Sequence, residues 1–314
     1  MTSIKFYPLI RGISSYLLPK SIFTHPGSGG TFSSEYCYSV WLRHLYYLIT
    51  NGLFDKPEDI KRIAEIGPGD SLGIGICALY TGAREYYAFD VLAHANQDKN
   101  IKISNEIHSY FDLNSDIPNT YRQRFTAPLL PNYSFPEFLK HYSNEHYSER
   151  KKEINMALKG NPETNTKIEY IVPWEKSTRT DIEKLDLIIS QAVMEHVNDI
   201  RFAYEEMYKW LKPGGVISHQ IDFKSHEMTH EWNGHWFIGE KLWNILAHGR
   251  KYPMNRLPLS SHIKTIEMAG FEVKFVLPIV KDNKFGNRTP KVPNVKFDKV
   301  DLNTSSALIQ AVKI

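Results

Sequence analysis

Short apolar runs alternate with longer amphipathic segments along most of this chain. The runs expected to form strands cover residues 62–66, 86–90, 168–172, 185–190, 216–222, 271–277 and 305–314. The segments expected to form helices cover residues 33–51, 71–81, 199–212, 239–247 and 260–269. Strands that alternate with helices predict an α/β fold: a mostly parallel, seven-stranded sheet with helices on both faces.

Local signals place several boundaries. Lys212-Pro-Gly-Gly215 predicts a turn before the fifth strand, and Gly270 is expected to end the helix before the sixth. The flexible stretch from Gly27 to Gly30 precedes the helix at 33–51, and Thr31 is the expected N-cap of that helix.

The connection between the second and third strands is longer than a single crossover helix requires. It contains proline-rich joints and a helical stretch at 136–159, and it predicts an insertion at about 100–165 over the active-site edge of the sheet. The chain is accordingly divided into three parts. These are an N-terminal arm and lid helix (1–55), a catalytic domain (56–280) and a C-terminal extension (281–314).

Composition narrows the class of protein. The chain has 314 residues and a formal net charge of +3, with its basic residues scattered, which argues against a nucleic-acid partner. Cys37 and Cys77 have no metal-binding spacing and favour the reducing cytoplasm. Lys5, Arg11 and Lys20 interrupt the apolar residues of the arm, so the arm is expected to pack on its own domain. Peripheral contact with a membrane surface remains open.

The most specific pattern is Arg62-Ile-Ala-Glu65-Ile-Gly67-Pro-Gly69-Asp70-Ser-Leu-Gly73. A strand, a glycine-rich turn and a helix in this order form a nucleotide-binding unit. A dinucleotide fingerprint requires a glycine where this chain has Leu72. Asp90 ends the next strand, about 20 residues after the turn. In such a unit an acidic residue at this position accepts hydrogen bonds from the ribose hydroxyls of the nucleotide.

This combination resembles motif I of the class I S-adenosylmethionine (SAM)-dependent methyltransferases. The resemblance implies a Rossmann-like fold and SAM as the cofactor. The residues expected to bind SAM here are Glu65, Gly67, Gly69, Asp70 and Asp90. An NAD-dependent sugar oxidoreductase and a SAM-binding protein without activity are the alternatives.

Two further segments belong to the expected SAM pocket. Trp174 follows the third strand and either stacks on the adenine or fills the core. After the fourth strand, Gln191 and Glu195 are expected to line the pocket, and Glu195-His196 resembles the Glu-His segment of many class I methyltransferases. In some families this segment extends to Glu-x-x-Glu-His and binds a divalent cation. Ala192 stands at the first Glu position here, so the metal site of those families is not favoured, although a divalent metal remains possible.

The exit of the fifth strand is rich in histidine and tryptophan. His226 or Asp222, with His196 third, is the expected general base. A metal site using some of Asp222, His226 and His230 is the second interpretation, and a hydrogen-bonded loop is the third.

Two other groups near this exit could bind an acceptor. Trp232 and Trp236 suit a sugar ring but would equally fill the gap under a long loop. Arg256 either binds an anionic group of the acceptor or forms a surface ion pair.

Together these motifs resemble methyltransferases encoded among bacterial surface-polysaccharide genes. That resemblance implies O-methylation of a sugar hydroxyl, on a glycan or a nucleotide sugar, by in-line transfer with a His or Asp general base.

Overall fold

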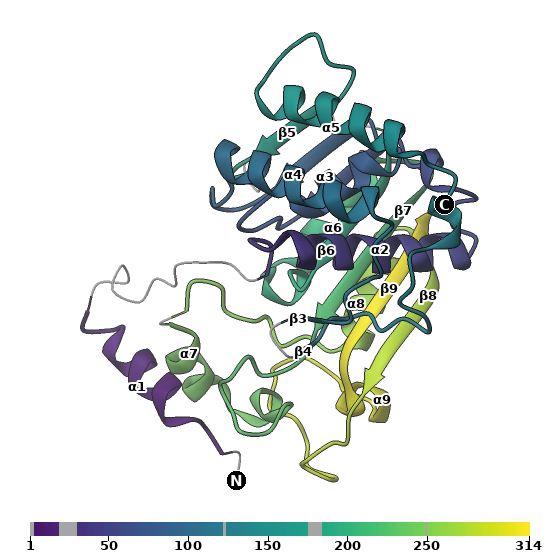
Figure 1. Cartoon of the computed structure of the whole chain (residues 1–314). Coiled ribbons are helices and arrows are strands. Elements are labelled where there is room, and N and C mark those ends of the chain that lie inside the picture. Colours follow the sequence, from purple (N-terminus) through teal and green to yellow (C-terminus); the bar gives the residue numbers. More distant parts are fainter. Residues whose placement is uncertain (1–2, 19–29, 122–123, 175–183, 249) are drawn as a thin grey trace.

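A seven-stranded sheet forms the centre of the protein (Figure 1). The computed structural model describes residues 3–18, 30–121, 124–174, 184–248 and 250–314; Lys20 and Gly27 lie outside this part. The strands are β1 (Arg62–Ile66), β2 (Glu85–Phe89), β5 (Lys167–Ile171), β6 (Leu185–Gln191), β7 (Leu211–Asp222), β8 (Phe271–Val280) and β9 (Thr304–Lys313). Their order is β5-β2-β1-β6-β7-β9-β8, and β9 runs antiparallel to both of its neighbours. The predicted sheet is confirmed.

Helices cover both faces of the sheet. On one face lie α2 (Ser34–Thr50), α3 (Gly73–Tyr80), α4 (Gln97–Asp112) and α5 (Asn144–Leu158). On the other face lie α6 (Ile200–Trp210) and α8 (Leu259–Met268). Side chains alternate along β1, so Ile63 packs in the core under the first layer and Ala64 in the core under the second. The sheet therefore separates two hydrophobic cores.

Two local predictions need correction. Ser33, not Thr31, caps α2, because the Ser33 hydroxyl accepts the backbone N–H of Tyr36. The turn expected at 212–215 lies within the bounds of β7, because Leu185 pairs with Leu211 before the register shifts to Leu187 and Val216.

The helix expected at 33–51 is packed in the core, and its role as a lid stays a prediction. α2 packs on α3, and Cys37, Leu42 and Leu45 are completely buried. A Cβ atom at Gly73 would lie 2.5 Å from the sulfur of Cys37, so the third glycine of the motif allows α2 to approach α3.

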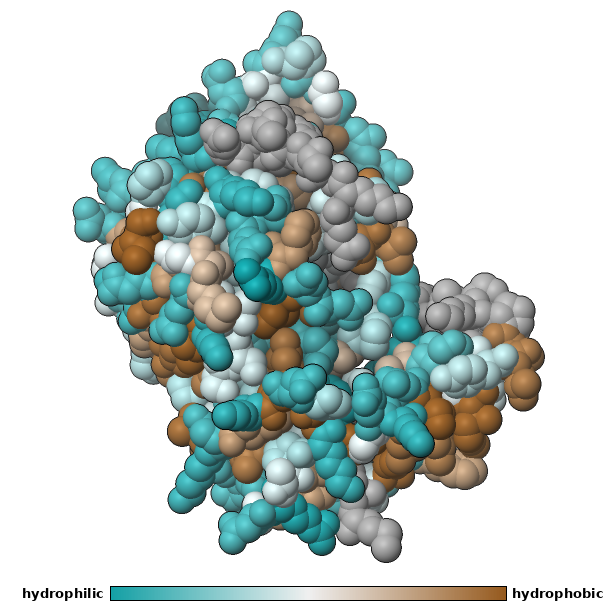
Figure 2. Space-filling model, turned by 180° about the vertical axis from the view of Figure 1, so that it is seen from behind, coloured by the Kyte–Doolittle hydropathy of each residue, from teal (hydrophilic) through white to brown (hydrophobic). Residues whose placement is uncertain are grey.

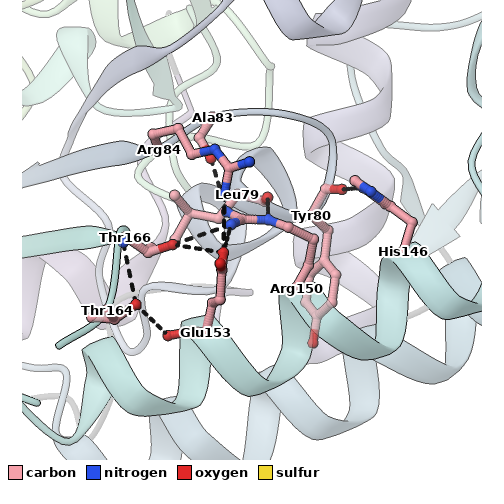
Figure 3. A network of polar contacts seen from close by, with 9 residues as sticks. All are labelled: Leu79, Tyr80, Ala83, Arg84, His146, Arg150, Glu153, Thr164 and Thr166. Carbon is pink, nitrogen blue, oxygen red and sulfur yellow. Dashed lines mark hydrogen bonds and ion pairs between the residues drawn. The ribbon is translucent and has the colours of Figure 1, made fainter.

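The helical part of the predicted insertion does not cover the active-site edge. Arg150 of α5 donates to the carbonyl groups of Leu79 and Ala83 and pairs with Glu153 (Figure 3). Leu79 and Ala83 lie where α3 ends and before β2 begins, so α5 packs at the opposite end of the sheet. Other parts of the insertion do reach the active edge: the carbonyl of Ala127 accepts from Gln191, and the side chain of Asn100 accepts the backbone N–H of Leu72.

The N-terminal helix α1 (Phe6–Ser14) packs on α7 (Glu240–His248), as expected for an arm that folds on its own domain. Its outer side carries the exposed residues Phe6, Ile10 and Ile13, and Figure 2 shows apolar side chains gathered at this edge of the molecule. Among the described residues, no helix is both long and apolar enough to cross a membrane. The structure also contains the hairpin β3 (Thr120–Tyr121) and β4 (Arg124–Phe125), and the short helix α9 (Lys299–Asn303).

Candidate active site

The glycine-rich turn lies at the carboxyl edge of β1. Gly67 and Gly69 have φ angles of +71° and +73°, which favour glycine. A Cβ atom at Gly67 would lie 2.6 Å from Cγ2 of Val193. The backbone conformation of the turn and its close packing against Val193 therefore both require glycine.

A cavity of about 210 Å³ opens over this turn. Six predicted site residues line it: Gly67, Gly69, Asp90, Trp174, Gln191 and His196. The other lining residues are Gly30, Thr31, Tyr36, Ile66, Pro68, Phe89, Val91, His94, Ala192, Val193, Val197 and Tyr252.

Asp90 is fixed at the end of β2 by backbone donors. Its Oδ1 atom accepts the N–H of Val91 at 2.7 Å, and its Oδ2 atom accepts the N–H of Gly69 at 3.3 Å. Burial raises the pKa of Asp90, while these backbone donors act in the opposite direction. The carboxylate thus joins the glycine-rich turn to β2 and faces the cavity.

Sequence reasoning missed four side chains of the cavity wall. Thr31 and Tyr36 come from the start of α2, and interpreting Thr31 as a helix cap hid its place here. Across the cavity, Nε2 of His94 and the hydroxyl of Tyr252 form a 2.7 Å hydrogen bond. Burial, followed by the charge of Asp90, raises the pKa of Tyr252 to about 12, so the phenol is neutral at neutral pH.

Three of the predicted SAM-binding residues do not line the cavity: Glu65, Asp70 and Glu195. Glu65 faces α3, where it accepts a hydrogen bond from the hydroxyl of Tyr86 at 2.5 Å, and burial raises its pKa to about 8. Asp70 is buried, and its backbone N–H donates to Oγ1 of Thr31 at 2.9 Å.

Trp174 is packed in the core, as one of the two expectations stated, and its stacking on an adenine stays a prediction. It lines the cavity, and it is packed between Phe202, with ring centroids 6.2 Å apart, and Trp210, at 6.1 Å.

His196 also belongs to a group of acidic and imidazole side chains beside the cavity. We call this group the carboxylate–histidine cluster, and its members are Glu195, His196, Asp222 and His226. Nε2 of His226 lies 3.5 Å from Oδ2 of Asp222 and 3.9 Å from Oε1 of Glu195. The rings of His196 and His226 are 5.0 Å apart. All three predicted bases belong to this cluster, whereas His230 is exposed and is not part of it.

The cluster has an uneven charge distribution. Burial works to raise the pKa of Asp222, but its hydrogen bond with His226 and the charge of Lys224 outweigh burial and bring the pKa to about 2. Burial and the neighbouring His226 lower the pKa of His196 to about 4. Burial, reinforced by the charge of Asp222, raises the pKa of Glu195 well above its usual range. Asp222 is therefore ionised and His196 neutral at neutral pH.

Comparison with known proteins identifies part of this arrangement. Residues 147–218 match the family model described as a methyltransferase domain. The protein carries a methyltransferase domain. The match includes Gln191 and the Glu195-His196 segment, whereas the glycine-rich turn precedes it. The sheet, with β9 antiparallel to its neighbours, has the Rossmann-like fold of class I methyltransferases, whose methyl donor is SAM.

Solved methyltransferase structures are similar in outline. A SAM-dependent methyltransferase from Methanosarcina mazei is 13% identical, with a TM-score of 0.42, and the alignment covers 85% of this chain and 97% of that one. One from Mesorhizobium loti is 13% identical, with a TM-score of 0.39 and coverages of 83% and 94%. Phosphoethanolamine N-methyltransferase 2 from Haemonchus contortus is 14% identical, with a TM-score of 0.43 and coverages of 87% and 52%. No curated protein sequence matches the chain.

The residues of this methyltransferase fit SAM. Gly67 has no room for a Cβ atom beside Val193, and Gly67 and Asp90 line the same cavity. The aromatic side chains of Tyr36 and Trp174 supply apolar walls. Gly67, Gly69 and Asp90 are thus the residues that would hold the cofactor, which supplies an activated methyl group when bound.

The structure decides between the alternatives on the acceptor side: both expectations for Arg256 are wrong, and the tryptophans follow the expectation that they pack under the loop. Arg256 is buried, donates to the carbonyl of Ile238 at 2.5 Å and lies 4.7 Å from the ring of Trp243, so it supports a loop instead of binding an anion or forming a surface ion pair. Trp236 is also buried, and Trp232 donates its indole N–H to the carbonyl of Asp282 at 2.9 Å. These tryptophans fill the gap under the loop.

Proposed function

We propose that this methyltransferase transfers the methyl group of SAM to a hydroxyl group of a sugar, on a glycan or a nucleotide sugar. The observation that carries the hydroxyl acceptor is the position of His196, which lines the SAM cavity and contacts the rest of the carboxylate–histidine cluster. The sugar is supported by the resemblance of the sequence motifs to polysaccharide-associated methyltransferases.

The reaction is an in-line displacement. The acceptor oxygen forms a bond to the methyl carbon while the carbon–sulfur bond of SAM breaks, and the electron pair of that bond stays on sulfur. Because the sulfonium makes the methyl group reactive, the protein mainly aligns the two reactants. An alcohol has a pKa far above neutral, so its proton must be removed for efficient attack.

The carboxylate–histidine cluster gives the proton a destination. The predicted bases His226, Asp222 and His196 lie together beside the cavity, and Asp222 is ionised and close to His226. An amine acceptor requires no such group once it is neutral. The cluster therefore favours a hydroxyl acceptor over an amine.

The setting of the reaction is part of the proposal. The buried free thiols of Cys37 and Cys77 fit the reducing cytoplasm. The exposed Phe6, Ile10 and Ile13 of α1 support peripheral contact with a membrane, where a lipid-linked glycan would be presented. Sedimentation with anionic vesicles tests this contact: Phe6→Asp should reduce binding, and equal binding by the variant would contradict it.

The direct test of the proposed function is transfer of radiolabelled methyl groups from SAM to a panel of nucleotide sugars, free sugars and amine acceptors. We expect label on a sugar hydroxyl, and no transfer by Asp90→Ala. Transfer to amines with none to any hydroxyl would overturn the proposal.

A further inference from the structure

Glu195 is a buried carboxyl group without a hydrogen-bond partner. The residue is 2% exposed, and neither carboxylate oxygen has a partner in hydrogen-bonding geometry among the described residues. Its nearest counter-group is Nε2 of His226, at 3.9 Å. A buried carboxyl group in this state destabilises the fold unless a proton or a bound ligand satisfies it.

The neighbours of Glu195 can supply the remaining bonds to a cation. One ligand atom from each of Glu195, His196 and His226 lies within 4.8 Å of the other two. A cation about 2.0–2.2 Å from each atom requires ligand atoms roughly 3–4 Å apart, so small side-chain movements suffice. Two imidazoles and one carboxylate suit divalent first-row transition metals.

The backbone around these three ligands is held in place from outside. The side chain of Asn255 donates to the carbonyls of Met194 and Val197, and its backbone N–H donates to the carbonyl of Glu195. Nδ1 of His196 lies 3.4 Å from the carbonyl of Pro253, which leaves Nε2 for a ligand.

His226 is held in an uncommon backbone conformation. It has φ +45°, and its carbonyl accepts from Arg250 at 3.0 Å. Such strain is retained where the surrounding structure fixes a functional side chain.

We propose that Glu195, His196 and His226 bind a divalent transition-metal cation beside the SAM cavity, with Asp222 next to the site. This inference rests on the proposed methyl transfer to a hydroxyl, and it explains how the acceptor hydroxyl loses its proton. The cation would bind the acceptor oxygen and lower the pKa of the hydroxyl. The released proton would pass by way of Asp222, whose side chain is 23% exposed, to solvent. The acceptor oxygen would form its bond to the methyl carbon as the carbon–sulfur bond of SAM breaks.

The test is calorimetric titration of the chelator-treated, full-length protein with Mn²⁺ and with Zn²⁺, together with thermal melting. We expect one cation per chain and a raised melting temperature. In Glu195→Gln the affinity should fall about tenfold or more. This variant should still fold, because a neutral amide removes an unpaired buried acid. His230→Ala is the matched control and should bind like the wild type.

Several outcomes separate this inference from the proposed function. Absence of cation binding by the wild type, or unchanged affinity in Glu195→Gln, would overturn the metal site. Undiminished methyl transfer in excess chelator would overturn it too while leaving the hydroxyl acceptor in place. Cation binding that depends on Glu195, with methyl transfer confined to amines, would support the metal site and overturn the proposed function.

Discussion

The hydroxyl of Thr31 accepts a hydrogen bond from the backbone N–H of Asp70 at 2.9 Å. The hydroxyl of Ser71 in turn donates to the carbonyl of Thr31. These bonds attach the start of α2 to the glycine-rich turn and bring Tyr36 to the cavity wall. The cofactor cavity is therefore built jointly by the N-terminal segment and the catalytic sheet.

Thr31→Val should weaken SAM binding about threefold to tenfold. The substitution keeps the shape of the side chain but leaves the buried N–H of Asp70 without its acceptor, at a cost of about 1 kcal/mol. Calorimetric titration with SAM measures the effect, and Thr31→Ser should bind like the wild type. Equal affinity in Thr31→Val would show that the contact does not shape the cavity.

His226→Ala should lower turnover by about 10²-fold or more while leaving SAM affinity unchanged. His226 belongs to the carboxylate–histidine cluster but does not line the cavity, so it acts on the proton of the acceptor and not on the cofactor. Single-turnover methyl transfer and calorimetry with SAM separate the two effects, with His230→Ala as the control. Unchanged turnover in His226→Ala would remove His226 from the chemistry.

Glu65→Gln should change how stability depends on pH. Burial raises the folded-state pKa of Glu65 from 4.5 to about 8, so the folded protein holds a proton that the unfolded chain releases. As pH rises between these two pKa values, Glu65 should therefore lower the free energy of unfolding of the wild type by about 1.4 kcal/mol per pH unit. Urea unfolding at several pH values measures it. The free energy of unfolding of the variant should rise relative to that of the wild type as pH rises. If the two proteins show the same dependence of stability on pH, the burial of an ionisable Glu65 is contradicted.

The sequence predicted the sheet and the core of the cofactor site because both depend on local patterns. Apolar runs gave the strands, and the spacing from Gly67 to Asp90 is set by a single strand–helix–strand unit. Glu65 was predicted to bind SAM because it lies in the same motif. Its side chain, however, points to the face of the sheet that α3 covers, because side chains alternate along β1.

Contacts between distant segments could not be predicted in this way. Tyr252 reaches the cavity from the connection between α7 and α8, and it forms a hydrogen bond with His94, which also lines the cavity. His226 joins Glu195 and His196 only because β6 and β7 are adjacent parallel strands that end at the same edge. The sequence instead grouped His226 with His230, its neighbour along the chain.

The most direct measurement is calorimetric titration of the purified protein with SAM and with S-adenosylhomocysteine, alongside Asp90→Ala. We expect micromolar binding of both ligands to the wild type and loss of binding in the variant, because Asp90 holds the glycine-rich turn and lines the cavity. Absence of binding to the wild type, or equal binding by Asp90→Ala, would contradict the assignment of this cavity to SAM.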